Sequence, residues 1–132
     1  MIALDTNVLV RFLVQDDPEQ ARIANTVMDQ LTDAAPGFVG REVLVELVWV
    51  LERAYGYQRA DIAAALDGLL SAIELEIEAA DEVGVAVDRY RNEGFGFADL
   101  MIAAAARRAD ARELVTFDRK AARLPGVRLL TA

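Results

Sequence analysis

Residues 2–7 have the sequence IALDTN, a short apolar run that leads directly into an acid, a hydroxyl and an amide. A short apolar run before polar residues is typical of a buried strand, and Asp, Thr and Asn favour the start of a helix. This stretch therefore predicts a buried first strand with Asp5 at its carboxyl end. Because parallel α/β sheets bind ligands at the carboxyl ends of their strands, Asp5 is the first candidate functional residue.

Strands and helices alternate along the rest of the chain. Short apolar stretches predict strands at residues 38–39, 75–77, 114–116 and 127–130, with segments of helical periodicity between them. The alternation predicts an α/β fold, specifically a three-layer α/β/α sandwich with a central, mostly parallel sheet of about five strands. No linker or repeat divides the chain, so residues 1–132 are expected to form a single domain.

Several local signals place the helices. Asp17 and Pro18 predict an N-cap followed by proline in the first turn, and Asp61 is expected to cap a later helix. Residues 41–54 predict a helix that is apolar on most of its faces, and residues 98–108 predict an alanine-rich helix. The segment 75–77 alternates with glutamates, which is typical of an edge strand.

The composition restricts the chemistry that this chain can perform. Its 132 residues include no cysteine and no histidine, whereas 22 are acidic. Disulfides, thiolate metal sites, cysteine nucleophiles and imidazole bases are therefore excluded. If the protein is an enzyme, we expect carboxylates that hold a hard cation such as Mg²⁺ or Mn²⁺.

The charge is unevenly distributed. The net charge is −8, but residues 1–99 carry −12 and residues 100–132 carry +4. An acidic protein is an unusual partner for nucleic acid, whereas a basic C-terminal segment is consistent with an edge that faces anions and equally with a solvated helix face. The chain has no apolar run long enough for a membrane span and no signal-peptide pattern, so a cytoplasmic protein is expected.

Four acids occupy positions that suit a site. Asp5 and Asp118 each follow a predicted strand, Glu46 interrupts a strongly apolar helix, and Asp99 lies on the inward face of the alanine-rich helix at its first turn. Such carboxylates can hold divalent ions that activate water for phosphodiester hydrolysis. Thr116, just before Asp118, is placed to orient a carboxylate or a bound water.

Each acid also has a purely structural explanation. Asp5 and Asp118 are suitable N-caps, and Asp99 is favoured by the dipole of its helix. Glu46 recurs with Glu42 at helical spacing, so a narrow solvated stripe is as good an explanation of Glu46 as a ligand role.

Four segments together resemble the PIN-domain ribonucleases, especially the VapC-type toxins of bacterial toxin–antitoxin pairs. The segments are residues 2–9 (IALDTNVL), 45–51 (VELVWVL), 97–104 (FADLMIAA) and 116–118 (TFD). None is specific alone, but their order and the chain length match the family, and the resemblance covers essentially the whole chain.

The resemblance implies an activity, a cofactor and partners. It implies that Asp5, Glu46, Asp99 and Asp118 bind Mg²⁺ or Mn²⁺ and cleave single-stranded or loop RNA, leaving a 5′-phosphate. It further implies that Thr6, Asn7 and Thr116 support this site. The expected partners are an RNA substrate, a cognate antitoxin protein and a second copy in a homodimer, with no membrane.

Two alternatives from other functional classes remain open at this point. One is an Mg²⁺-dependent phosphoryl-transfer or receiver-type domain, which also uses acids at strand ends. It fits poorly, because Asp5 is followed by Thr6 and Asn7, and Lys120 falls on a predicted helix. The other is a non-catalytic α/β binding module, in which the acids are caps and ion pairs and divalent metal has no effect.

Overall fold

The computed structural model describes residues 1–131, in which short parallel strands alternate with helices. The helices are α1 (Thr6–Val14), α2 (Pro18–Gln30), α3 (Arg41–Arg53), α4 (Arg59–Ser71), α5 (Ala80–Glu93) and α6 (Phe97–Arg108). The strands are β1 (Ile2–Ala3), β2 (Gly37–Val39), β3 (Leu75–Ile77), β4 (Leu114–Thr116) and β5 (Val127–Leu129). A 3₁₀ turn, η1 (Ala121–Arg123), lies between β4 and β5.

A side-chain N-cap marks the start of α1 and α2, whereas α3, α4, α5 and α6 begin without a side-chain cap. The Asp17 side chain accepts a hydrogen bond from the Gln20 N–H at 3.0 Å, with Pro18 in the first helical position. The prediction that Asp61 caps a helix is wrong. Helix α4 already begins at Arg59, and Asp61 lies in its first turn, where a negative charge still favours the helix dipole.

The five strands are parallel, as expected, but they form two sheets. The first has the order β1-β2-β3, with Ile2 opposite Gly37 and Phe38 opposite Glu76. The second is the pair β4-β5, in which Val115 lies opposite Arg128. Strand β3 is an edge strand, as its alternating glutamates predict, and β1 forms the other edge of the three-stranded sheet.

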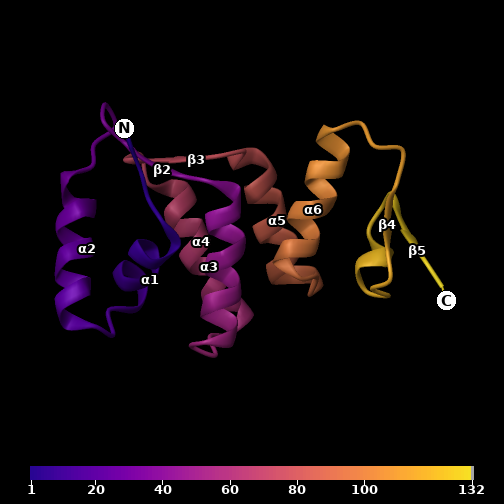
Figure 1. Cartoon of the computed structure of the whole chain (residues 1–132), viewed down its shortest axis with the longest axis horizontal. Coiled ribbons are helices and arrows are strands. Elements are labelled where there is room, and N and C mark those ends of the chain that lie inside the picture. Colours follow the sequence, from indigo (N-terminus) through magenta and orange to yellow (C-terminus); the bar gives the residue numbers. More distant parts are fainter. Residues whose placement is uncertain (132) are drawn as a thin grey trace.

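Helices separate the two sheets along the long axis of the molecule. Figure 1 shows α1 and α2 at one end, α3 to α6 in the middle, and the β4-β5 pair beyond α6 at the other end. Helix α1 packs on α2 and α3, and α6 packs on α3 and α5. The β4-β5 pair is therefore attached to the side of α6 rather than to β1.

One hydrophobic core joins the helices to the three-stranded sheet. Its fully buried side chains include Leu9 of α1, Leu47 and Leu51 of α3, and Tyr90 of α5. The core extends to Leu124, just after η1, which is 3% exposed. Across residues 1–131, no helix has the length and apolar character needed to cross a membrane.

A half-buried polar cluster holds the segment that leads into α6. The Arg59 guanidinium donates to the carbonyl oxygens of Tyr90 at 3.0 Å and Phe95 at 2.7 Å, and it lies over the Tyr90 ring. The Tyr90 hydroxyl donates to Glu52 at 2.8 Å. Burial, together with the Glu52 carboxylate, raises the pKa of Tyr90 well above its ordinary value, so the phenol stays protonated. The start of α6, which carries Asp99, is thereby held in place.

Candidate active site

Asp5 and Glu46 form the first acidic pair. Asp5 follows β1 and caps α1, because its carboxylate accepts a hydrogen bond from the Thr6 N–H at 2.8 Å. Thr6 is buried, with 4% of its surface exposed, and its hydroxyl donates to the Glu46 carboxylate. A buried hydroxyl requires a partner, so Thr6 ties the exposed Glu46 of α3 to the end of β1.

The first acidic pair lines a cavity of about 400 Å³ at the carboxyl end of β1. Asn7 lines the same cavity, and Arg11 and Tyr55 contribute a cation and a phenol to its wall. Thr6 and Asn7, which were predicted to support Asp5, therefore both lie at this site. Thr6 acts through Glu46, whereas Asn7 is exposed to the cavity.

Asp99 and Asp118 form the second acidic pair. Asp99 is half-buried in the first turn of α6, and its side chain lies against Gly96, where a Cβ atom would stand 3.0 Å from Oδ2. Burial raises the pKa of Asp99, and the nearby charge of Asp118 raises it further, while Lys120 opposes both effects. The negative charges of Asp99 and Asp118 repel each other, and a bound cation would relieve this repulsion.

Asp118 and Thr116 are held by local hydrogen bonds. The Asp118 carboxylate accepts from the backbone N–H groups of Lys120 at 2.8 Å and Ala121 at 2.9 Å, so it caps the turn as its position predicts. The Thr116 hydroxyl accepts from the Asp118 N–H at 3.0 Å. Thr116 thus orients the backbone of the neighbouring acid.

The two acidic pairs remain separate within one chain. Over residues 1–131, no three acidic side chains gather closely enough to hold a metal ion. The donor chemistry suits Mg²⁺ or Mn²⁺, because all four side chains are carboxylates. The arrangement in a single copy does not yet make a metal site, because each pair supplies only two of these side chains.

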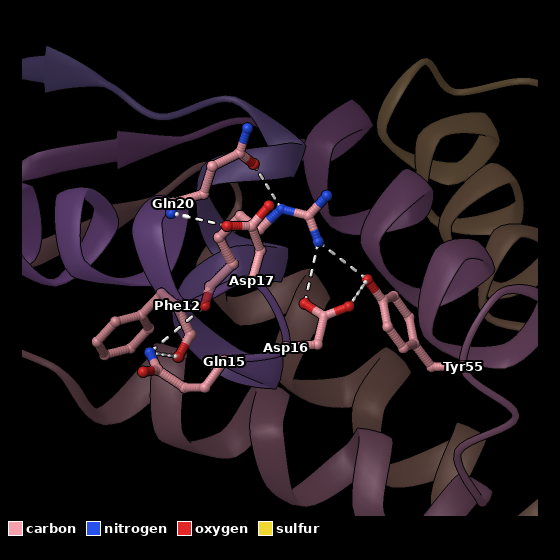
Figure 2. A network of polar contacts seen from close by, with 7 residues as sticks. Phe12, Gln15, Asp16, Asp17, Gln20 and Tyr55 are labelled. Carbon is pink, nitrogen blue, oxygen red and sulfur yellow. Dashed lines mark hydrogen bonds and ion pairs between the residues drawn. The ribbon is translucent and has the colours of Figure 1, made fainter.

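A hydrogen-bonded network holds Arg11 beside the first acidic pair, and it includes Asp16, an acid for which no role was predicted. Arg11 donates to Gln20 at 2.7 Å, to Asp16 at 3.0 Å and to the Tyr55 hydroxyl at 3.1 Å. The Tyr55 hydroxyl donates to Asp16 at 2.9 Å, and Figure 2 shows these two side chains facing each other. The only sequence signal for this network is the location of Arg11 on the helix that Asp5 begins.

Replacing Asp16 with asparagine should reduce stability at neutral pH and much less in acid. The hydrogen bond from Tyr55 and the charge of Arg11 hold the pKa of Asp16 below its ordinary value of 3.8. A depressed pKa stabilises the folded state above the unfolded-state pKa, and this contribution is lost as the pH falls through the folded-state pKa. Urea unfolding of the wild type and Asp16→Asn at pH 7 and pH 3 measures the difference. Equal differences at both pH values would contradict the prediction.

An apolar groove of about 510 Å³ runs between α3 and α6. Trp49 and Ile102 line it and are 58% and 52% exposed. Glu46 lines both this groove and the cavity at β1, so the two hollows adjoin at the first acidic pair.

Comparisons with known proteins identify the family. The family model described as the PIN domain matches residues 2–127. The chain is also 28% identical over 120 residues to a protein named VapC ribonuclease from Aquifex aeolicus (strain VF5), covering 91% of this chain and 89% of that protein. No solved structure gives a significant match. The family match covers almost the whole chain and confirms the resemblance and the α/β class, so the chain belongs to the PIN domain family.

Proposed function

We propose that this protein is an endoribonuclease that acts as the toxin of a toxin–antitoxin pair. Membership of the PIN domain family and the similarity to a VapC ribonuclease support this proposal. The observation that carries it furthest is the first acidic pair, in which a buried threonine fixes Glu46 at the strand end beside Asp5. The substrate is single-stranded or loop RNA, whose phosphodiester bonds are hydrolysed to leave a 5′-phosphate.

In this proposal the four acids hold Mg²⁺ or Mn²⁺. The bound cation supplies water activation and stabilises the charge that develops on the phosphate. Asp5 and Glu46 contribute donors on one side, and Asp99 and Asp118 contribute donors on the other. Thr6 positions Glu46, Thr116 positions Asp118, and Asn7 offers an amide to the substrate in the cavity.

Two cations beside the acids offset the repulsion between this acidic protein and RNA. Arg11 lines the cavity of the first acidic pair, and Lys120 lies close enough to the second to lower the pKa of Asp99. The C-terminal segment with its net charge of +4 extends the basic surface. The excess of acidic residues elsewhere suits an antitoxin that is basic. The proposal also includes a cytoplasmic location and a homodimer.

A direct test is cleavage of a structured RNA pool with Mg²⁺, with Mn²⁺ and with a chelator. We expect cleavage with either ion, none with the chelator, and 5′-phosphates on the products. A protein that leaves every RNA intact with either ion is not the proposed nuclease. Unchanged folding and stability on adding metal would instead favour a non-catalytic binding module.

Mg²⁺ should raise the melting temperature of the wild type. A ligand that binds only the folded state stabilises it by mass action, by roughly 2.7 kcal/mol at 100 times its dissociation constant. Replacing Asp5 and Asp118 together with asparagine should abolish the increase, because each acidic pair then lacks a member. Differential scanning calorimetry over a series of Mg²⁺ concentrations measures it, with Ca²⁺-free buffer and equal ionic strength as controls. An increase that persists in the double variant would place the ion elsewhere.

A further inference from the structure

Arg11 has two N–H groups that the protein itself does not use. A guanidinium carries five N–H donors in one plane. The Nε atom donates to Gln20, and Nη1 donates to both Asp16 and the Tyr55 hydroxyl. Within residues 1–131, the other terminal nitrogen, Nη2, donates to no acceptor. Its two N–H groups are therefore free to bind a ligand.

The three acceptors hold the Arg11 guanidinium in one orientation. Gln20 belongs to α2, Asp16 to the segment between α1 and α2, and Tyr55 to the segment after α3. Figure 2 shows Gln20 on one side of this network and Asp16 and Tyr55 together on the other. Because bonds on two of its three nitrogens fix the plane of the guanidinium, Nη2 keeps a fixed direction and loses little freedom on binding.

Arg11 lies where two hollows of the surface meet. It lines the cavity of the first acidic pair, which has a volume of about 400 Å³, and a second hollow of about 310 Å³ between α1 and α2. Asn7, one helical turn earlier on α1, lines both hollows as well. Each hollow also has an apolar wall, with Val50 in the first and Ile23 in the second. Both volumes fall in the range of about 300–1,000 Å³ that is typical of ligand pockets.

We propose that Arg11 binds the phosphate that links two nucleotides of single-stranded RNA, whose bases occupy the two hollows. The inference rests on the proposed function, because RNA is the substrate proposed there. Unpaired RNA alternates an anionic phosphate with a flat base whose faces are apolar. Two apolar-walled hollows that meet at a guanidinium follow the same alternation, and guanidinium groups bind phosphate through paired N–H donors. Asp16 and Tyr55 are then positioning residues, because they act through Arg11.

The surroundings of Arg11 favour a ligand over a purely structural ion pair. Its side chain stays 29% exposed beside Asp16, whereas a cation that only tied α1 to the rest of the fold would need no open cavity. Within residues 1–131, Arg11 forms no hydrogen bond with Asp5 or Glu46 of the same cavity. A phosphate at Arg11 therefore lies in the cavity whose acids are proposed to hydrolyse RNA, whereas an acidic peptide would have no use for those acids.

Binding of a labelled RNA tests the Arg11 contact without requiring cleavage. The probe is a fluorescent single strand of about ten nucleotides, in a buffer with a chelator that keeps it intact. Arg11→Gln should raise the dissociation constant about 10-fold or more, because it removes a charged pair of donors. Arg22→Gln is the matched control, because Arg22 is an exposed cation of α2 that lines neither hollow, and it should change the constant by about twofold at most. Fluorescence anisotropy measures both constants.

The salt dependence of binding separates a phosphate contact from a general loss of structure. Each phosphate contact of a single strand adds about 0.7 to the slope of log affinity against log salt concentration, so Arg11→Gln should lower that slope by about 0.7. Arg11→Lys should weaken binding but keep the slope, because an ammonium group keeps the charge and lacks the planar fork. A phosphate carries no sequence information, so probes rich in uridine and in adenosine should lose affinity equally.

A double-variant cycle tests the positioning role of Tyr55. Tyr55→Phe keeps the ring and removes the hydroxyl that bonds to both Arg11 and Asp16. In the wild-type background it should weaken RNA binding about threefold or more without changing the salt slope. In the Arg11→Gln background it should have no further effect, because Tyr55 then has no guanidinium to position. An equal loss in both backgrounds would overturn the positioning role.

The binding and cleavage assays give independent answers. If the wild type binds no RNA, or if a folded Arg11→Gln protein binds it with wild-type affinity or salt slope, Arg11 is not a phosphate site, and RNA cleavage by the wild type would leave the proposed function standing. If binding depends on Arg11 as described but neither Mg²⁺ nor Mn²⁺ supports cleavage, the phosphate site stands and the proposed function is wrong. A polyglutamate peptide that binds as tightly as the RNA, with the same dependence on Arg11, would overturn RNA as the ligand in favour of a protein.

Discussion

Replacing Asp5 with asparagine should lower the rate of RNA cleavage by about 100-fold or more, a loss typical of removing one charged group from a catalytic site. Asparagine keeps the shape of the side chain and can still accept the hydrogen bond from Thr6, so α1 should remain capped. What disappears is the negative charge at the end of β1. Initial rates on a labelled RNA measure the effect, and Asp99→Asn should show a loss of the same order.

Asp29→Asn is the matched control for the loss of charge. Asp29 is an exposed acid on α2, away from both acidic pairs, and its replacement should leave the rate within a factor of two or so. Circular dichroism and thermal unfolding of all three variants separate a lost site from a lost fold. If Asp5→Asn cleaves as fast as Asp29→Asn while remaining folded, Asp5 has no part in the chemistry.

Replacing Leu47 with alanine should reduce the free energy of unfolding by roughly 2–5 kcal/mol. Leu47 lies in α3 with none of its surface exposed, inside the core that joins the helices to the three-stranded sheet. The substitution removes buried methyl groups and leaves a cavity that the close-packed surroundings fill only partly. Urea denaturation, fitted with a common slope for wild type and variant, measures the change.

Ile23→Ala is the matched control for size, because it removes the same number of carbons from a helical residue that is 50% exposed. Its effect should stay within about 1 kcal/mol. A Leu47→Ala protein as stable as Ile23→Ala would mean that α3 does not pack as described. Because Leu47 follows Glu46 directly, a loosened α3 should also weaken the first acidic pair and lower activity.

The sequence predicted local structure well, because local structure depends on neighbouring residues. Asp17 and Pro18 carry the full signal for the start of α2, and the helix begins at Pro18. The prediction that Asp61 is an N-cap was wrong, because an acid is favourable both at the N-cap and in the first turn of a helix. The sequence alone does not distinguish these two positions. The glutamates around Leu75 and Ile77 correctly marked β3 as an edge strand.

The candidate site was predictable as a set of residues but not as an arrangement. Asp5 and Asp118 follow strands, and any parallel sheet places such residues at strand ends. The hydrogen bond from Thr6 to Glu46 joins residues 40 positions apart in the sequence, and the bond from Arg11 to Tyr55 joins residues 44 positions apart. No local sequence pattern predicts contacts over such separations.

The amino-acid sequence alone is enough to identify an α/β protein of parallel strands and to limit its strong site chemistry to carboxylates. Composition and periodicity are sufficient for both conclusions, because they depend on residue type and on local spacing. Which strands are neighbours became known from the three-dimensional arrangement, in which β1 and β4 are sheet edges and the four acids form two pairs. Local sequence does not predict this arrangement, because strand pairing depends on long-range packing and backbone hydrogen bonding, to which every short apolar strand in the sequence is equally suited.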